Sequence, residues 1–112
     1  MAENVNKEGT IYVMKVAGVN GFRIGVYSTS RKARERQVRG GTGIKVRIIW
    51  EQKLSSKAHA LAVEALAHLY LAKCEKRRQV GWRNIQIFEC KKNLAEASCK
   101  RAIKVIGLSS FG

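Results

Sequence analysis

The chain has 112 residues, 46% of them hydrophobic, which is enough for one domain with its own core and too few for two. Its 22 Lys and Arg residues outnumber 8 acidic residues for a net charge of +14, and every acidic residue is Glu. The absence of Asp argues against calcium loops and Asp-based metal clusters. The positive charge makes a polyanion, and nucleic acid first, the expected partner.

Membrane and disulfide classes are not favoured. No apolar run approaches the roughly 20 residues that a membrane-spanning helix needs, because charged and polar residues interrupt the longest nearly uncharged stretch, residues 58–72. The N-terminus lacks the basic-then-apolar pattern of a secretory signal, which predicts a cytoplasmic protein. Cys74, Cys90 and Cys99 have no CxxC spacing, so we expect packed thiols rather than a zinc site or a disulfide framework.

The first third of the chain predicts a hairpin followed by a basic helix. Residues 1–8 are polar and without periodicity, which predicts a flexible leader. Residues 10–16 and 22–27 are rich in β-branched and aromatic side chains and flank a turn with Gly and Asn, so they are expected to pair. Residues 31–39 form a short basic helix, which a hydroxyl of residues 28–30 caps and two glycines end.

The rest of the chain predicts one more strand and then helices. Alternating apolar residues over 44–50 fit a third strand. Ser55 or Ser56 caps a long helix that reaches about Arg77, with apolar residues at helical spacing. Three segments are expected after it: an extended stretch over residues 82–90, a last helix over residues 94–106 that Asn93 caps, and a tail over residues 107–112.

These elements predict a single α/β (α+β) domain over residues 9–106. Two paired strands, a basic helix, a third strand and then helices indicate a small three-stranded antiparallel sheet flanked by helices. No proline, repeat or low-complexity linker divides the chain.

Tyr12 and Arg23 are the first candidate catalytic pair. Ile11 and Val13 are the better candidates to face the core, which leaves Tyr12 on the other face or at its margin. Arg23 is in the facing strand, so the two side chains are expected side by side, where the guanidinium would favour the phenolate form of the tyrosine. A cation–π contact or a simple cross-strand pair is the structural alternative.

Glu64 and His68 are one turn apart at the edge of the apolar stripe of the long helix. A lone carboxylate beside a core face is a candidate ligand for Mg²⁺ or Mn²⁺, because such ions often take only one or two carboxylates, with water and substrate phosphate. A hydrogen-bonded Glu–His pair with a structural role is the alternative. His68 is the accompanying candidate catalytic residue.

The basic helix and the segments after it are the third feature. Their side chains cannot all face one way, so most are expected to contact solvent or phosphate, and one could clamp a reacting phosphate. The residues expected to bind nucleic acid are Arg31, Lys32, Arg36, Arg39, Lys45, Arg47, Arg77 and Arg78.

The chain resembles the GIY-YIG nuclease domain in four places, Gly9–Val13, Phe22–Gly25, Arg34 and Glu64, in this order and at about the family's distances. It is most similar to a phage-associated branch in which the second motif reads YKIG, and the resemblance covers residues 9–106. It implies a metal-dependent endonuclease that hydrolyses DNA, expected to be double-stranded, in the cytoplasm of a host cell.

The resemblance also implies a role for each matched residue. Tyr12 would act as general base or orient the attacking water, Arg34 would stabilise the charge on the pentacoordinate phosphorus, and Glu64 would hold one Mg²⁺ or Mn²⁺ ion. Arg31 is the alternative to Arg34, and Arg23 stands where many members have the second tyrosine.

A non-catalytic nucleic-acid-binding or inhibitory protein on the same scaffold is the alternative function. Val38 favours it, because several members have His or Tyr at that place, one turn after the arginine. Tyr12, Arg34 and Glu64 favour the nuclease. Members of the family commonly take their sequence preference from an attached DNA-binding domain, so the resemblance leaves three possibilities open: nonspecific nicking, reliance on a partner protein, or a homodimer in which each subunit cuts one strand.

Overall fold

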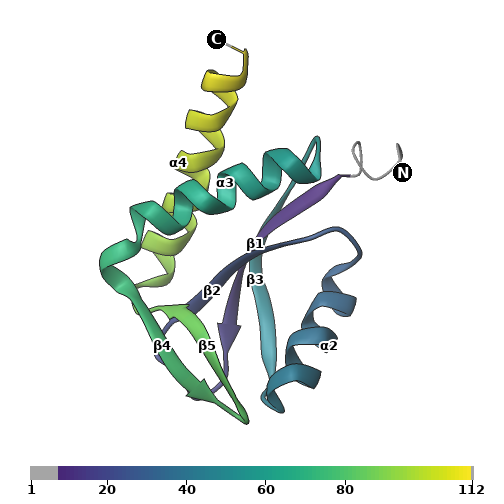
Figure 1. The fold of residues 1–112 in the computed structure, drawn as a ribbon, viewed down its shortest axis with the longest axis vertical. Helices are drawn as coiled ribbons and strands as arrows, with labels where there is room; N and C mark the ends of the chain where they lie inside the picture. Colours follow the sequence, from purple (N-terminus) through teal and green to yellow (C-terminus); the bar gives the residue numbers. More distant parts are fainter. Residues whose placement is uncertain (1–7, 112) are drawn as a thin grey trace.

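A computed structural model describes residues 8–111, so the leader expected over residues 1–8 lies, apart from Glu8, outside the described residues. The chain forms an antiparallel sheet of five strands in the order β3-β1-β2-β5-β4, with helices packed against it (Figure 1). The predicted α+β class is confirmed, but the sheet has five strands rather than three.

The elements follow one another as β1 (Gly9–Val16), β2 (Phe22–Tyr27), α2 (Arg31–Thr42), β3 (Val46–Leu54), α3 (Lys57–Tyr70), the 3-10 turn η1 (Ala72–Cys74), β4 (Glu75–Val80), β5 (Arg83–Phe88) and α4 (Lys92–Phe111). Residues 107–111, expected as a tail, continue α4, and Gly112 lies outside the described residues. In the described part of the chain, no helix is long and apolar enough to cross a membrane.

Hydroxyl side chains begin two of the helices as the sequence predicts. Ser30 Oγ accepts the backbone N–H of Ala33 in the first turn of α2, and Ser56 Oγ, from one of the two candidate serines, accepts that of His59 in the first turn of α3. The glycine pair at residues 40–41 lies inside α2 rather than at its end. The helix ends at Gly43 instead, whose φ of 76° is the left-handed conformation of a C-terminal cap.

The fourth strand is where the sequence-based prediction of a long helix is wrong, whereas β5 lies within the extended stretch predicted over residues 82–90. The helix expected to reach about Arg77 ends at Tyr70, because Glu75–Gln79 are all exposed and offer no apolar stripe to bury. This segment pairs with β5 instead. The hairpin then buries Val80, Ile85 and Ile87 in a small core beneath it.

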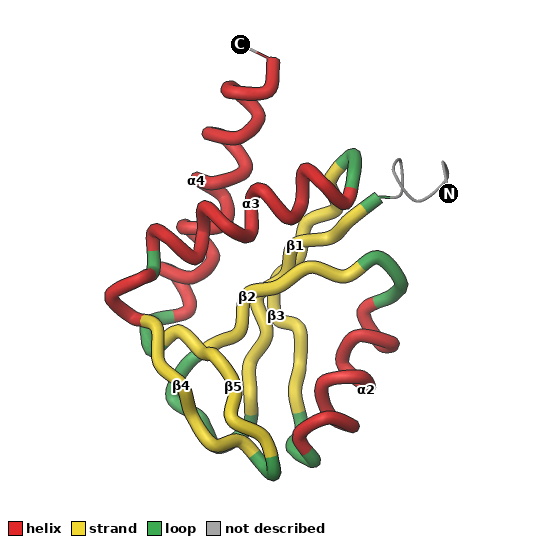
Figure 2. The backbone as a smooth tube through the Cα atoms, in the orientation of Figure 1, coloured by secondary structure: helices red, strands yellow, loops and turns green. Residues whose placement is uncertain are grey.

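Both faces of β1 are buried. Ile11 and Val13 belong to the main core under α3 and α4, whereas Tyr12 and Met14 point to the opposite face, under α2. Figure 2 shows α3 and α4 meeting at one end of the molecule while α2 lies apart, beside β3. A strand covered on both sides holds its side chains in fixed positions, which is what a site built on β1 needs.

The β4–β5 hairpin is tied to the main sheet at one place. Phe22 pairs with Phe88, and this is the one β2–β5 register pair within residues 8–111. The far end of the hairpin reaches α2, where the Trp82 backbone N–H donates to the Thr42 carbonyl at 3.2 Å. Between these two anchors the hairpin diverges from β2, and a groove opens there.

Candidate active site

Tyr12 is fully buried on the face of β1 opposite the main core, as the alternation of apolar residues predicts. Its hydroxyl accepts a hydrogen bond of 3.0 Å from Arg34 Nε, and the guanidinium carbon lies 5.6 Å from the centre of the ring. A second donor of Arg34, Nη1, bonds the Gln37 side-chain oxygen at 2.7 Å. Arg34, and not Arg31, is therefore the arginine that contacts the tyrosine.

Gly25 makes room for the phenol. It pairs with Tyr12 across the β1–β2 ladder, and a Cβ at this position would lie 2.5 Å from the tyrosine hydroxyl oxygen. Any larger residue would therefore push the ring away from Arg34. The sequence contained a signal for this, since a glycine inside an otherwise apolar strand often marks a close approach.

Arg23 shares a face with Tyr12, as predicted, but is not directly opposite it. Arg23 pairs with Met14, so it is the diagonal neighbour of the tyrosine, and Gly25 takes the opposite position. Its Nε atom is buried and has no hydrogen-bond partner in the described part of the chain. Arg23 also lines the groove, where its guanidinium could donate to a phosphate oxygen.

Glu64 is an acidic residue whose carboxyl is influenced by both guanidinium groups. Burial raises the pKa of its carboxyl, and the charges of His68, Arg34 and Arg23 oppose that shift. Within residues 8–111 its carboxylate makes no hydrogen bond or ion pair, so the predicted alternative of a Glu64–His68 hydrogen bond is not formed. The carboxylate is therefore available to a ligand.

His68 is fixed by the sheet instead. Its Nε2 atom lies 2.9 Å from the Ile24 carbonyl oxygen, and its ring lies 4.9 Å from that of Phe88. Because a carbonyl oxygen can only accept, Nε2 carries the proton and Nδ1 is left as the other ring nitrogen. The contact holds α3, and with it Glu64, against β2.

The residues present fit a divalent cation of the magnesium type better than zinc. Among the described residues, no group of three or more His, Cys, Asp or Glu side chains is arranged to hold a metal, which disfavours a structural zinc site. A single half-buried carboxylate without a protein partner fits Mg²⁺ or Mn²⁺, which keep several waters and share substrate phosphate oxygens.

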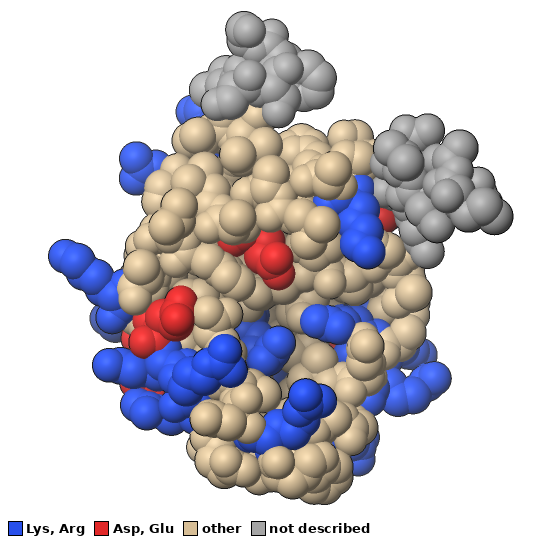
Figure 3. Space-filling model, in the orientation of Figure 1, with Lys and Arg blue, Asp and Glu red and all other residues tan. Residues whose placement is uncertain are grey.

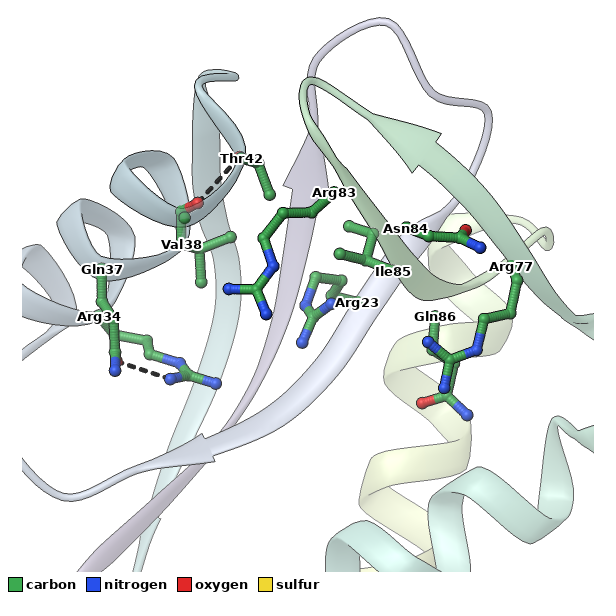
Figure 4. A pocket seen from close by; sticks show the side chains of 11 residues that line it. Arg23, Arg34, Gln37, Val38, Thr42, Arg77, Arg83, Asn84, Ile85 and Gln86 are labelled. Atoms are coloured by element: carbon green, nitrogen blue, oxygen red, sulfur yellow. Dashed lines mark hydrogen bonds between the residues drawn. The ribbon is translucent and has the colours of Figure 1, made fainter.

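A cationic groove of about 430 Å³ opens between β2, α2 and the β4–β5 hairpin. Figure 4 shows Arg34 and Gln37 on the α2 side, Arg77 and Gln86 on the hairpin side, and Arg23 with Arg83 between them. In the space-filling view, Lys and Arg gather around this hollow over α2 and the hairpin, while the surface over α3 is mostly uncharged (Figure 3).

Arg83, Gln37, Asn84 and Gln86 line the groove and were missed from the sequence. The available signal was Gly81, followed by the alternation of Ile85 and Ile87, which together indicate a hairpin with a tight turn. Without that hairpin, nothing in the sequence places β5 beside α2.

The basic residues expected to bind nucleic acid divide into distinct groups. Arg77 lines the groove, whereas Arg39, Lys45 and Arg47 line a second hollow between α2 and β3. Lys32 and Arg36 are exposed on α2 and line neither hollow.

Arg31 and Arg78 are both engaged by carboxylates. Arg31 Nε lies 2.9 Å from Glu51 Oε1, and Arg78 contacts both oxygens of Glu89, at 2.9 and 3.1 Å. Glu51 also accepts the hydroxyl of Tyr27, and burial first, then this carboxylate, raises the pKa of Tyr27. These arginines stabilise the protein surface and have less capacity left for phosphate.

The site therefore joins a buried phenol, two guanidinium groups facing a groove and one half-buried carboxylate, from β1, β2, α2 and α3. Such a set can hold a phosphodiester by its oxygens and stabilise negative charge that develops on phosphorus. Comparison of the chain with protein families, with curated proteins and with solved structures found no match, and what the site does therefore follows from its own residues.

Proposed function

We propose that the protein is a metal-dependent DNA endonuclease of the GIY-YIG type, which hydrolyses phosphodiester bonds with one Mg²⁺ or Mn²⁺ ion. The observation that carries the proposal is the 3.0 Å hydrogen bond from Arg34 to the buried Tyr12 hydroxyl, at the wall of a groove that Arg23 also lines. Glu64 supports it, because both guanidinium charges act on its carboxyl.

Arg23 and Arg34 supply the charge that phosphoryl chemistry requires. Both line the groove, so a phosphate there can receive donors from a strand, β2, and from a helix, α2. As the attacking oxygen adds to phosphorus, negative charge grows on the equatorial oxygens, and guanidinium groups that donate to these oxygens stabilise it more than they stabilise the ground state.

Tyr12 acts after Arg34 has turned to the phosphate. The phenol is 0% exposed while Arg34 covers it, so no water reaches its hydroxyl in that arrangement. When the guanidinium, which lines the groove, leaves Tyr12 and Gln37 for a phosphate oxygen, the hydroxyl beneath it is uncovered. As a phenol it can then orient the water, and it can accept the water's proton only after its own proton has passed to another base.

Glu64 is the residue that would hold the divalent ion, on the side of the site formed by α3. Such an ion neutralises charge on the phosphate and on the leaving oxygen. His68 keeps α3 in place through the Ile24 carbonyl. The positive charge of +14 supports DNA as the substrate, and a cytoplasmic location and a second copy or partner protein belong to the same proposal.

Nicking of supercoiled plasmid in Mg²⁺ or Mn²⁺ tests the proposal. Glu64→Gln and Arg34→Ala should each lower the cleavage rate by about 10²-fold or more, the effect of losing one electrostatic stabiliser. Glu75→Gln on β4 and Lys100→Ala on α4 are matched controls, because both residues are exposed and neither lines the groove, and both variants should cleave as the wild type does.

Two results would contradict the nuclease. Cleavage that survives Glu64→Gln removes the carboxylate from the mechanism. Tight DNA binding with no cleavage in either metal favours the non-catalytic binding protein instead.

A further inference from the structure

The groove is closed at one end by the turn of the β4–β5 hairpin. Gly81 and Trp82 form a two-residue turn with φ of 58° at the glycine, the pattern of a type II′ turn. A Cβ at Gly81 would overlap the Thr42 carbonyl oxygen, and the Trp82 N–H donates to that same oxygen. The turn therefore packs directly against the C-terminal end of α2.

The volume of the groove limits what enters it. About 430 Å³ lies in the range of about 300–1,000 Å³ that small-ligand sites occupy. One or two nucleotides fit such a space. A whole duplex is too large to enter it, since its major and minor grooves are about 12 and 6 Å wide, and intact duplex can present only one backbone to the arginines at its rim.

The lining is suited to the phosphates of a strand. Arg23, Arg34, Arg77 and Arg83 come from four elements, and no acidic residue within residues 8–111 lines the groove. The side chains of Arg77 and Arg83 make no hydrogen bond or ion pair within the same range. Arg77 is paired with Gln86 across the hairpin, so a cation and an amide lie next to each other on this wall.

Trp82 offers an exposed aromatic ring next to the groove: it does not line the groove itself, but it precedes Arg83 in the turn and donates its backbone N–H to Thr42, and both of these residues do line it. Its side chain is 69% exposed, the second most exposed large hydrophobic side chain in the described part of the chain after Leu69. Its six-membered ring lies against Gly43, where any Cβ would overlap it, so one face is supported by backbone and the other is open to solvent. A ring held in this way on a basic surface can stack a nucleobase.

We propose that the groove binds an unpaired DNA strand, with its phosphates on Arg77 and Arg83 and a base stacked on Trp82. The inference rests on DNA being the ligand, as proposed above, and it refines the expected double-stranded substrate. The preferred substrate is DNA with unpaired nucleotides beside the scissile phosphate, such as a gap or a displaced strand.

Binding without metal tests this independently of cleavage. The ligands are a short single-stranded oligonucleotide, the matching duplex, and the same duplex with a gap. The single strand and the gapped duplex should bind more tightly than the intact duplex, and should quench tryptophan emission, because stacking on Trp82 changes the environment of an exposed indole. Trp50 is half-buried at the main core and serves as the constant background.

Substitutions then identify the residues. Trp82→Ala should weaken binding of the single strand roughly 5- to 150-fold, which corresponds to about 1–3 kcal/mol per stacked base, and Trp82→Phe should retain most of the affinity. Arg83→Ala should reduce the salt slope of single-strand binding by about 0.7, the loss of one phosphate contact. Leu69→Ala, at an exposed apolar residue of α3, is the control and should bind as the wild type does.

Equal affinity for the intact duplex and the single strand would overturn the inference, and so would a Trp82→Ala variant with unchanged affinity. Neither result bears on plasmid nicking. Conversely, single-strand preference through Trp82 with no cleavage in any metal would contradict the nuclease and leave this binding mode in place.

Discussion

Gly25→Ala tests whether the Tyr12–Arg34 hydrogen bond needs the space that glycine leaves. An alanine Cβ would lie 2.5 Å from the phenol oxygen, whereas ordinary contacts begin at 3.4 Å, so the hydroxyl must retreat by about 0.9 Å. A hydrogen bond of 3.0 Å from Arg34 Nε does not survive a displacement of that size. We therefore expect a loss of DNA cleavage as well as of stability.

The size of the stability loss follows from two opposing terms. Overpacking a buried site costs about 1–3 kcal/mol, and replacing glycine with alanine inside a strand returns about 0.5–1 kcal/mol. The net loss is about 1 kcal/mol, which lowers Tm by about 4 °C for a domain of this size. Gly40→Ala is the matched control, since a Cβ there meets nothing within 4 Å and the helix gains up to about 1 kcal/mol.

Thermal unfolding and plasmid nicking of the single and double variants measure these effects. In a Tyr12→Phe background the atom nearest to the new Cβ is absent, so Gly25→Ala should cost less stability there than in the wild type. An unchanged Tm for Gly25→Ala, or the same loss in both backgrounds, would refute the packing argument. Full cleavage activity in Gly25→Ala would remove the hydrogen bond from the mechanism.

Two further predictions follow from buried ionisable groups. Burial raises the pKa of Glu64, so the stability this residue contributes at low pH is lost as pH rises through its folded-state pKa. Glu64→Gln should therefore unfold at a higher urea concentration than the wild type near neutral pH, and the difference between the two midpoints should vanish below about pH 4. A variant less stable than the wild type near neutral pH would contradict this. Burial also raises the pKa of Cys90 to about 11 and that of Cys99 to about 12. At about pH 8 only about a thousandth of the Cys90 side chains are thiolate. Iodoacetamide should therefore alkylate both thiols far more slowly in the native protein than in denaturant, which peptide mass spectrometry can measure. Equal rates would show that these thiols are not packed.

The sequence predicts an element well where the residues of that segment themselves determine its conformation. The β1–β2 hairpin has two apolar runs and a glycine turn, and Ser30 and Ser56 cap helices with their own hydroxyls. β4 has no such signal, because Glu75–Gln79 face solvent and Val80 alone is buried. Its strand conformation comes from pairing with β5, a tertiary effect that single-segment propensity does not contain.

The helix that covers Tyr12 shows a second limit of pattern reading. α2 buries only Thr42 completely, so its sequence gives little sign that it packs on the sheet. It docks through polar contacts instead: Arg34 lies over the Tyr12 ring, and Glu35 accepts the Ile48 backbone N–H at 2.6 Å. Hydrophobic periodicity does not detect packing of this kind. The sequence therefore places Tyr12 on the second face of the sheet, but it does not predict that the side chain is completely buried there.

Net charge predicts attraction to a polyanion, and the structure distinguishes which cations can also bind it closely. An arginine that donates to a carboxylate has already satisfied the donors that a phosphate would use, as Arg31 and Arg78 have. Arg77 and Arg83 carry the same charge and line the groove. Within residues 8–111 their side-chain donors make no hydrogen bond or ion pair. We therefore expect long-range attraction from the whole surface, and short-range binding only at the arginines that lack an acidic partner. For this reason the hairpin, of which the sequence predicted only the second strand, matters more to the proposed substrate than the basic helix that the sequence did predict.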